Sequence, residues 1–111
     1  MRYKCDFPQE RKALEQLIQK IEKAEECIWE AFDTDFFSDA KSFTYEVENF
    51  ISRTENISPE VKQELLPLAE EGSIAIRSRL DSTGARTHRA SVCMTKLSRK
   101  VNYILRLESC E

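Results

Sequence analysis

Four stretches of the chain carry apolar residues at alternating spacings of three and four, and turn-forming or capping residues separate these stretches. Such spacing places the apolar side chains on one face of an α-helix. In the first stretch Leu14, Leu17, Ile21 and Ile28 share a face in this way. The pattern predicts helices over residues 8–32, 38–54, 59–81 and 86–109.

The third helix has the clearest start and an internal interruption. Ser58 is a typical N-cap, and Pro59 fits the first helical position because its missing N–H is not needed there. Pro67 cannot donate the hydrogen bond that a helix interior requires. We therefore expect the third helix to be kinked or broken near Pro67.

Length and composition indicate how these helices assemble. The chain has 111 residues, with 2 Gly and 3 Pro, which leaves little material for the many turns of an all-β domain. Connections as short as these make neighbouring helices antiparallel. The sequence predicts an all-α fold, an up-down-up-down antiparallel four-helix bundle formed by residues 1–111 as a single domain.

No apolar run is long enough for a membrane span, and the first residues lack the apolar core of a signal peptide. The sequence therefore predicts a cytoplasmic protein without membrane contact, in which the four cysteines are reduced. Two pairs could nevertheless be neighbours across the first and fourth helices, Cys27 with Cys93 and Cys5 with Cys110. Disulfides between them would instead indicate an extracytoplasmic protein.

Residues that could perform chemistry are sparse. His88 is the single histidine, and Cys93 lies about 140° around the helix from it. The cysteine spacing fits neither a zinc site nor a thioredoxin-like motif. We predict no catalytic residues, no metal site and no cofactor.

Aromatic residues cluster where the first helix meets the second. Trp29 lies at the edge of the apolar stripe, and Phe36 and Phe37 are consecutive, so both cannot point into one narrow core. Asp35 and Asp39 would form an acidic rim around them. These five residues are the candidate protein-binding surface, and Trp29 or Phe37 could also pair two copies in a homodimer. A plug that closes the end of the bundle is the structural alternative.

Charge is distributed unevenly along the chain. Residues 1–73 hold 9 Lys and Arg against 17 Asp and Glu, whereas residues 74–111 hold 8 against 3. The start and outer face of the fourth helix form a candidate anion-binding site, whose residues are Arg86, His88, Arg89, Lys96 and Arg99. Because the chain as a whole is acidic, we favour ion pairs with Glu15, Glu22, Glu26 or Glu30 of the first helix over binding of nucleic acid.

The sequence thus favours a small non-enzymatic bundle that acts by binding a protein partner, in the manner of an adaptor, inhibitor, immunity or regulatory protein. The alternative is anion or nucleic-acid binding by the fourth helix.

Overall fold

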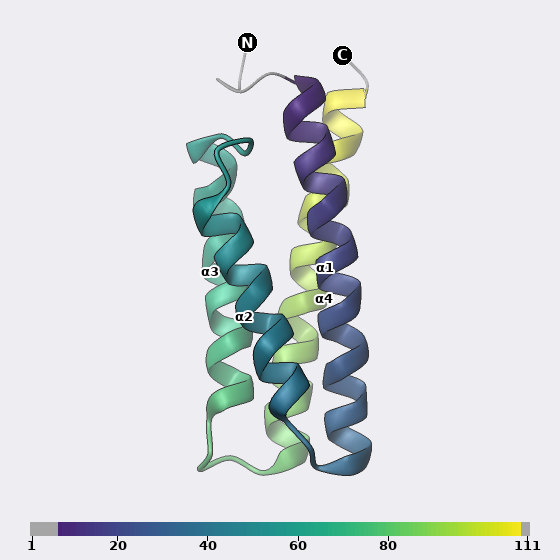
Figure 1. Ribbon diagram of the computed structural model, residues 1–111, viewed down its shortest axis with the longest axis vertical. Coiled ribbons are helices and arrows are strands. Elements are labelled where there is room, and N and C mark those ends of the chain that lie inside the picture. The colour runs from purple at the N-terminus through teal and green to yellow at the C-terminus, as the bar shows by residue number, and fades with distance from the viewer. Residues whose placement is uncertain (1–6, 110–111) are drawn as a thin grey trace.

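Residues 7–109 are described by a computed structural model, in which they form four α-helices. These are α1 (Phe7–Thr34), α2 (Ser38–Arg53), α3 (Pro59–Arg77) and α4 (Thr83–Ser109). Consecutive helices run in opposite directions, so the α1–α2 turn and the α3–α4 connection lie at the same end of the molecule (Figure 1). The predicted up-down-up-down bundle is confirmed.

Each helix packs against two neighbours, in the cycle α1, α2, α3, α4 and back to α1. The apolar stripes meet in the middle, and Leu14, Leu65 and Leu97 are fully buried. Phe43 is partly buried against this core. Burial of each large apolar side chain contributes about 1.5–3 kcal/mol to folding, which is why the stripes determine the architecture.

The third helix ends earlier than its apolar pattern predicts. α3 ends at Arg77, so Leu80, which lies within the predicted range 59–81, is outside the helix and fully exposed. The chain turns where the Ser78 hydroxyl donates to Oδ2 of Asp81 over 2.9 Å. The fourth helix begins at Thr83, three residues before the predicted start.

Of the kink or break predicted near Pro67, the break is absent, because α3 continues through this residue. Pro67 lies on the exposed side of the helix, where loss of one backbone hydrogen bond is least costly. At the start of the helix the prediction holds. Ser58 is the N-cap, and its side chain accepts a hydrogen bond from the Val61 amide.

Helices α3 and α4 approach closely at Gly72. A Cβ atom at this position would lie 2.8 Å from Cε of Met94 and 3.3 Å from Cβ of Cys93. The glycine that weakens α3 as a helix therefore allows it to pack tightly against α4.

The same contact involves one of the two thiols that the sequence pairs across the first and fourth helices. Cys27 and Cys93 are both buried and free, so no disulfide joins them, and Cys93 lies against Gly72 of α3. The predicted proximity of these two thiols stays a prediction. The predicted pair of Cys5 and Cys110 lies outside the described residues.

Candidate functional site

Three large aromatic side chains are exposed at the end of the bundle that contains the α1–α2 turn. The exposed fractions are 61% for Trp29, 52% for Phe32 and 61% for Phe36. Trp29 and Phe32 form an edge-to-face pair with ring centroids 6.4 Å apart. We call Trp29, Phe32 and Phe36 the aromatic cluster.

Two members of the aromatic cluster, Trp29 and Phe32, border a hollow between α1 and α4. This hollow has a volume of about 250 Å³, and its lining includes Trp29, Phe32 and His88. Ile28 supplies an apolar floor, and Thr87 and Ser91 of α4 supply hydroxyl groups. An apolar side chain could enter this hollow and contact the indole, while its neighbours reached the hydroxyls.

Phe37, which the sequence placed in the binding surface, is instead part of the core. Its side chain is 8% exposed and packs beneath the guanidinium of Arg86, 3.7 Å from the ring centroid. The reason is the local geometry, since consecutive residues at the start of α2 point in different directions and Phe36 takes the outward one. Phe37 is therefore not available to a partner or to a second copy of the chain.

The two aspartates of the predicted rim differ in their hydrogen bonding. Asp39 is exposed in the first turn of α2. Asp35 has a φ of 62°, and its carboxylate accepts a short hydrogen bond from the Thr83 hydroxyl. Asp35 therefore ties the α1–α2 turn to the start of α4 and also contributes negative charge beside the aromatic cluster.

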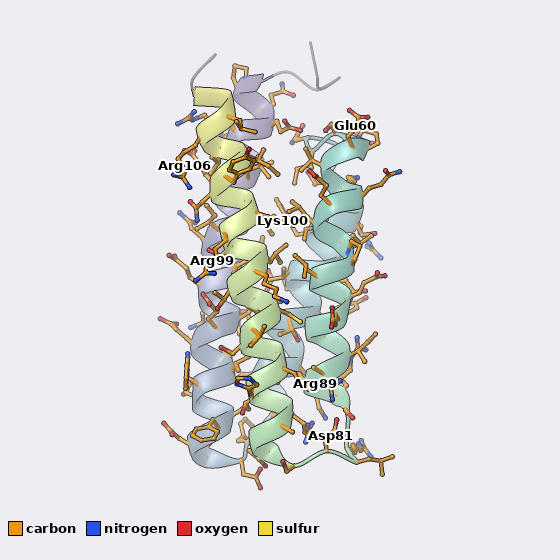
Figure 2. All side chains as sticks on the ribbon, turned by 180° about the vertical axis from the view of Figure 1, so that it is seen from behind. Glu60, Asp81, Arg89, Arg99, Lys100 and Arg106 are labelled. Atoms are coloured by element: carbon orange, nitrogen blue, oxygen red, sulfur yellow. The ribbon has the colours of Figure 1, made fainter. Side chains whose placement is uncertain are left out.

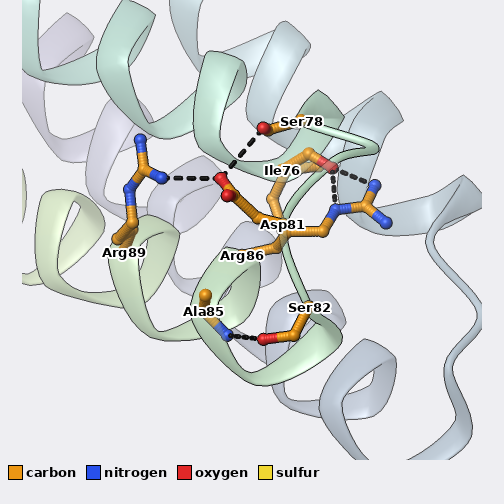
Figure 3. Close-up of polar contacts among 7 residues, drawn as sticks. All are labelled: Ile76, Ser78, Asp81, Ser82, Ala85, Arg86 and Arg89. Carbon is orange, nitrogen blue, oxygen red and sulfur yellow. Dashed lines mark hydrogen bonds and ion pairs between the residues drawn. The ribbon is translucent and has the colours of Figure 1, made fainter.

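Arg86, the first residue of the predicted anion site, is committed to the fold. Its Nε donates to the Ile76 carbonyl over 3.0 Å, and its Nη2 donates to the same oxygen (Figure 3). Ile76 lies in the last turn of α3, where carbonyl groups lack partners within the helix. Arg86 therefore satisfies the end of α3 and stacks on Phe37, so it is not free to bind an anion.

Arg89 is also paired, because its Nη1 lies 2.7 Å from Oδ2 of Asp81 (Figure 3). His88 is exposed and faces the hollow beside Trp29. The structure therefore does not bring the five predicted anion-binding residues together in one site.

Farther along α4 the cations are unpaired. Lys96, Arg99, Lys100 and Arg106 are all exposed, and none makes an ion pair with another residue in the range 7–109. We call these four residues the cationic row, and Figure 2 shows three of them along the outer side of α4. Tyr103 lies among them with an exposed fraction of 58%.

The predicted ion pairs between α4 and α1 are therefore wrong. Glu15 and Glu26 pair within α1, with Arg11 and Lys23. The edge of α4 that meets α1 contributes a hydroxyl group there, as Thr95 donates to Oε2 of Glu25 over 3.5 Å. Partial burial raises the pKa of the Glu25 carboxyl, and this hydrogen bond opposes the shift. The cations of α4 lie instead on its outer side and toward α3.

Two residues that matter at the two ends of the bundle were not among the predicted site residues. Phe32 fits both the apolar stripe of α1 and the aromatic group at the first turn, and it is exposed because α1 ends within a turn of it, where the core no longer covers it. Glu10 is fully buried, and its Oε2 accepts a hydrogen bond from the Ser58 amide over 2.8 Å. The signal for Glu10 was present, because a carboxylate on the apolar stripe with Leu14 and Leu17 requires a buried partner.

No three His, Cys, Asp or Glu side chains converge as metal ligands within residues 7–109. Over the same residues, no helix combines the length and apolarity that a bilayer crossing demands. No family model matches the chain, and no curated protein or solved structure is significantly similar to it.

Proposed function

We propose that the protein binds another protein through the aromatic cluster of Trp29, Phe32 and Phe36, and that it does so without catalysis, as an adaptor or a regulator would. The observation behind this proposal is the exposure of all three aromatic side chains at one end of the bundle, where Trp29 and Phe32 line the hollow between α1 and α4. Aromatic side chains in such positions provide most of the binding energy in many protein interfaces.

The surrounding charges suggest the chemistry of the partner. Glu30, Asp33 and Asp39 are exposed around the cluster, and Asp35 adds a further carboxylate. A complementary surface carries an apolar side chain for the hollow and Lys or Arg residues around it. Free, buried thiols at Cys27 and Cys93 support the reducing, cytoplasmic setting in which we place this interaction.

Alanine substitutions within the cluster test the proposal. Each variant is immobilised and exposed to native extract, and the captured proteins are quantified by mass spectrometry. Trp29→Ala and Phe32→Ala should lower capture of the same partner at least about tenfold, because a buried aromatic anchor contributes about 2 kcal/mol or more to binding. The melting temperature should stay nearly constant, since these rings lie outside the core.

Tyr45→Ala is the matched control, because Tyr45 is 51% exposed on α2 and lies outside the cluster. This variant should retain full capture. Equal loss from Tyr45→Ala, or a large fall in stability in Trp29→Ala, would contradict the proposal. Concentration-dependent dimerisation that Trp29→Ala abolishes would identify the partner as a second copy of the chain.

A further inference from the structure

The outer side of α4 is strongly basic although the molecule is acidic. The chain has a net charge of −3, yet the cationic row of Lys96, Arg99, Lys100 and Arg106 makes no ion pair within residues 7–109. These side chains are exposed, and Arg99, Lys100 and Arg106 lie in the half of α4 away from the α3–α4 connection (Figure 2). Neighbouring like charges repel one another, so binding of an anionic ligand that neutralises them is electrostatically favourable.

The row extends along one helix. Lys96 and Arg106 are ten positions apart, which corresponds to about 15 Å at the rise of an α-helix. One strand of nucleic acid in a duplex carries about four phosphates over this length. The length and charge of the row therefore match a short run of phosphates along a polymer.

Beside the row, a groove runs between α3 and α4. Two adjoining hollows of about 470 and 620 Å³ share Gln63, Glu64 and Lys100 as lining residues. Tyr103 also lines this groove, and half of its surface is exposed. An exposed aromatic ring next to cations is the arrangement on which unpaired bases stack.

The opposite wall of the groove is acidic, because Glu60 and Glu64 lie on α3. Phosphates would be repelled there, whereas carboxylate and amide oxygens can accept hydrogen bonds from the amino groups of bases. A strand that places its phosphates on the cationic row and turns its bases toward the groove pairs the cations of α4 with phosphates. It also gives the acceptor oxygens of α3 amino groups to bind. A duplex cannot turn its bases outward in this way.

We propose that this face of α4, together with the α3–α4 groove, is a binding site for single-stranded nucleic acid. The row holds the phosphates, and Tyr103 stacks on a base. The proposal does not depend on the aromatic cluster at the other end of the bundle. An anionic membrane is a poorer fit, since among the described apolar side chains of α4 only Tyr103 and the less exposed Val92 are exposed, while Leu105 and Leu107 are half-buried.

The test measures binding of a dye-labelled oligonucleotide of about 12 nucleotides, oligo(dT) or oligo(U), by fluorescence anisotropy. Four neutralised phosphates predict that the dissociation constant rises about 50-fold between about 50 and about 200 mM salt. Arg99→Glu/Lys100→Glu should abolish detectable binding at the lower salt concentration. Lys12→Glu/Arg53→Glu changes the net charge equally at exposed positions on α1 and α2 and should alter affinity less than about twofold.

Substitutions at Tyr103 distinguish binding of nucleic acid from binding of other polyanions. Tyr103→Ala should weaken oligonucleotide binding at least about fivefold, while Tyr103→Phe retains the stacking ring and the affinity. Neither variant should change the binding of polyphosphate. The helical content of every variant is checked by circular dichroism, and Arg99→Gln/Lys100→Gln replaces the charge-reversal variant if that one does not fold.

Several results would overturn the proposal. These are no binding at low salt, equal loss in the Lys12→Glu/Arg53→Glu control, tighter binding of a duplex than of the single strand, and an unchanged affinity in Tyr103→Ala. Binding to anionic vesicles without binding to the oligonucleotide would assign the face to a membrane instead.

Discussion

Asp35 is the non-glycine residue that takes a left-handed backbone conformation within residues 7–109, with a φ of 62°. Its amide donates to the Ala31 carbonyl over 2.9 Å and so closes the last turn of α1. Side chains disfavour this conformation, and Asp tolerates it better than most residues. The Thr83 hydroxyl then holds the carboxylate, so one residue sets both the direction of the turn and its attachment to α4.

Substitutions at Asp35 should separate these two contributions. Asp35→Gly removes the free-energy cost of the left-handed backbone conformation but loses the hydrogen bond from Thr83. Asp35→Ala keeps this conformational cost and also loses the hydrogen bond. We expect Asp35→Ala to be less stable than Asp35→Gly by about 1 kcal/mol, and Asp35→Asn to resemble the unmodified protein. Urea denaturation measures the order, and equal stability of the Ala and Gly variants would contradict a left-handed residue here.

At the scale of the elements, Arg86 determines how α3 is joined to α4. Its planar guanidinium stacks on Phe37 of the α1–α2 turn and donates to the Ile76 carbonyl at the end of α3. One side chain therefore connects three segments at this end of the bundle. Lysine has the same charge, but its compact ammonium group offers neither a planar face nor a forked pair of donors.

Arg86→Lys should consequently lower the free energy of unfolding by about 1–2 kcal/mol, through loss of the stacking contact and of one hydrogen bond. Arg79→Lys in the same region is the matched control, because Arg79 is exposed and forms no hydrogen bond or ion pair within the described residues. This change should alter stability by less than about 0.5 kcal/mol. If both variants behave alike in chemical denaturation, Arg86 does not join these segments.

For the whole molecule, periodicity was sufficient to predict the architecture, because buried faces repeat with the period of the helix. Periodicity could not show toward which of the two neighbouring helices a residue at the edge of an apolar stripe would point. Cys93 lies against Gly72 of α3, and the cations of α4 form no ion pair with the glutamates of α1 among the described side chains.

Helix ends and outward positions also depended on distant contacts. Leu80 continues the apolar pattern of α3, but the helix stops earlier, where Arg86, ten residues after Ile76, satisfies its last turn. Of Phe36 and Phe37, the pattern required one to point outward without identifying which. The exposed aromatic cluster was anticipated in part through Trp29 and Phe36. Phe32 fits the apolar stripe as well as the aromatic group, so its exposure depends on where α1 ends.

The buried thiols give a prediction for the whole fold. Burial raises the pKa of both Cys27 and Cys93, so the folded protein keeps them protonated at pH values where the unfolded chain ionises. The stability that they contribute is fully present below the unfolded thiol pKa of about 8.5 and is lost as pH rises through the folded values. Cys27→Ala/Cys93→Ala should therefore lose less stability than the unmodified protein between about pH 8 and pH 10.

Labelling with iodoacetamide checks the same burial directly. Peptide mapping should show Cys27 and Cys93 modified at least about 100-fold faster in urea than in the native protein. Rapid labelling of the native thiols would mean that Cys27 and Cys93 are not buried in the folded protein.

The hydrogen bond between Glu10 and the Ser58 amide fastens the first turns of α1 to the start of α3, across 48 positions of sequence. Within α3, this amide precedes the helical ladder, so nothing local protects it from solvent protons. Its deuterium uptake therefore reports the opening of this end of the molecule separately from fraying of α3. We expect slow deuterium exchange at the Ser58 amide and faster exchange in Glu10→Gln. The exchange rate of this single amide would then measure how often α1 separates from the start of α3.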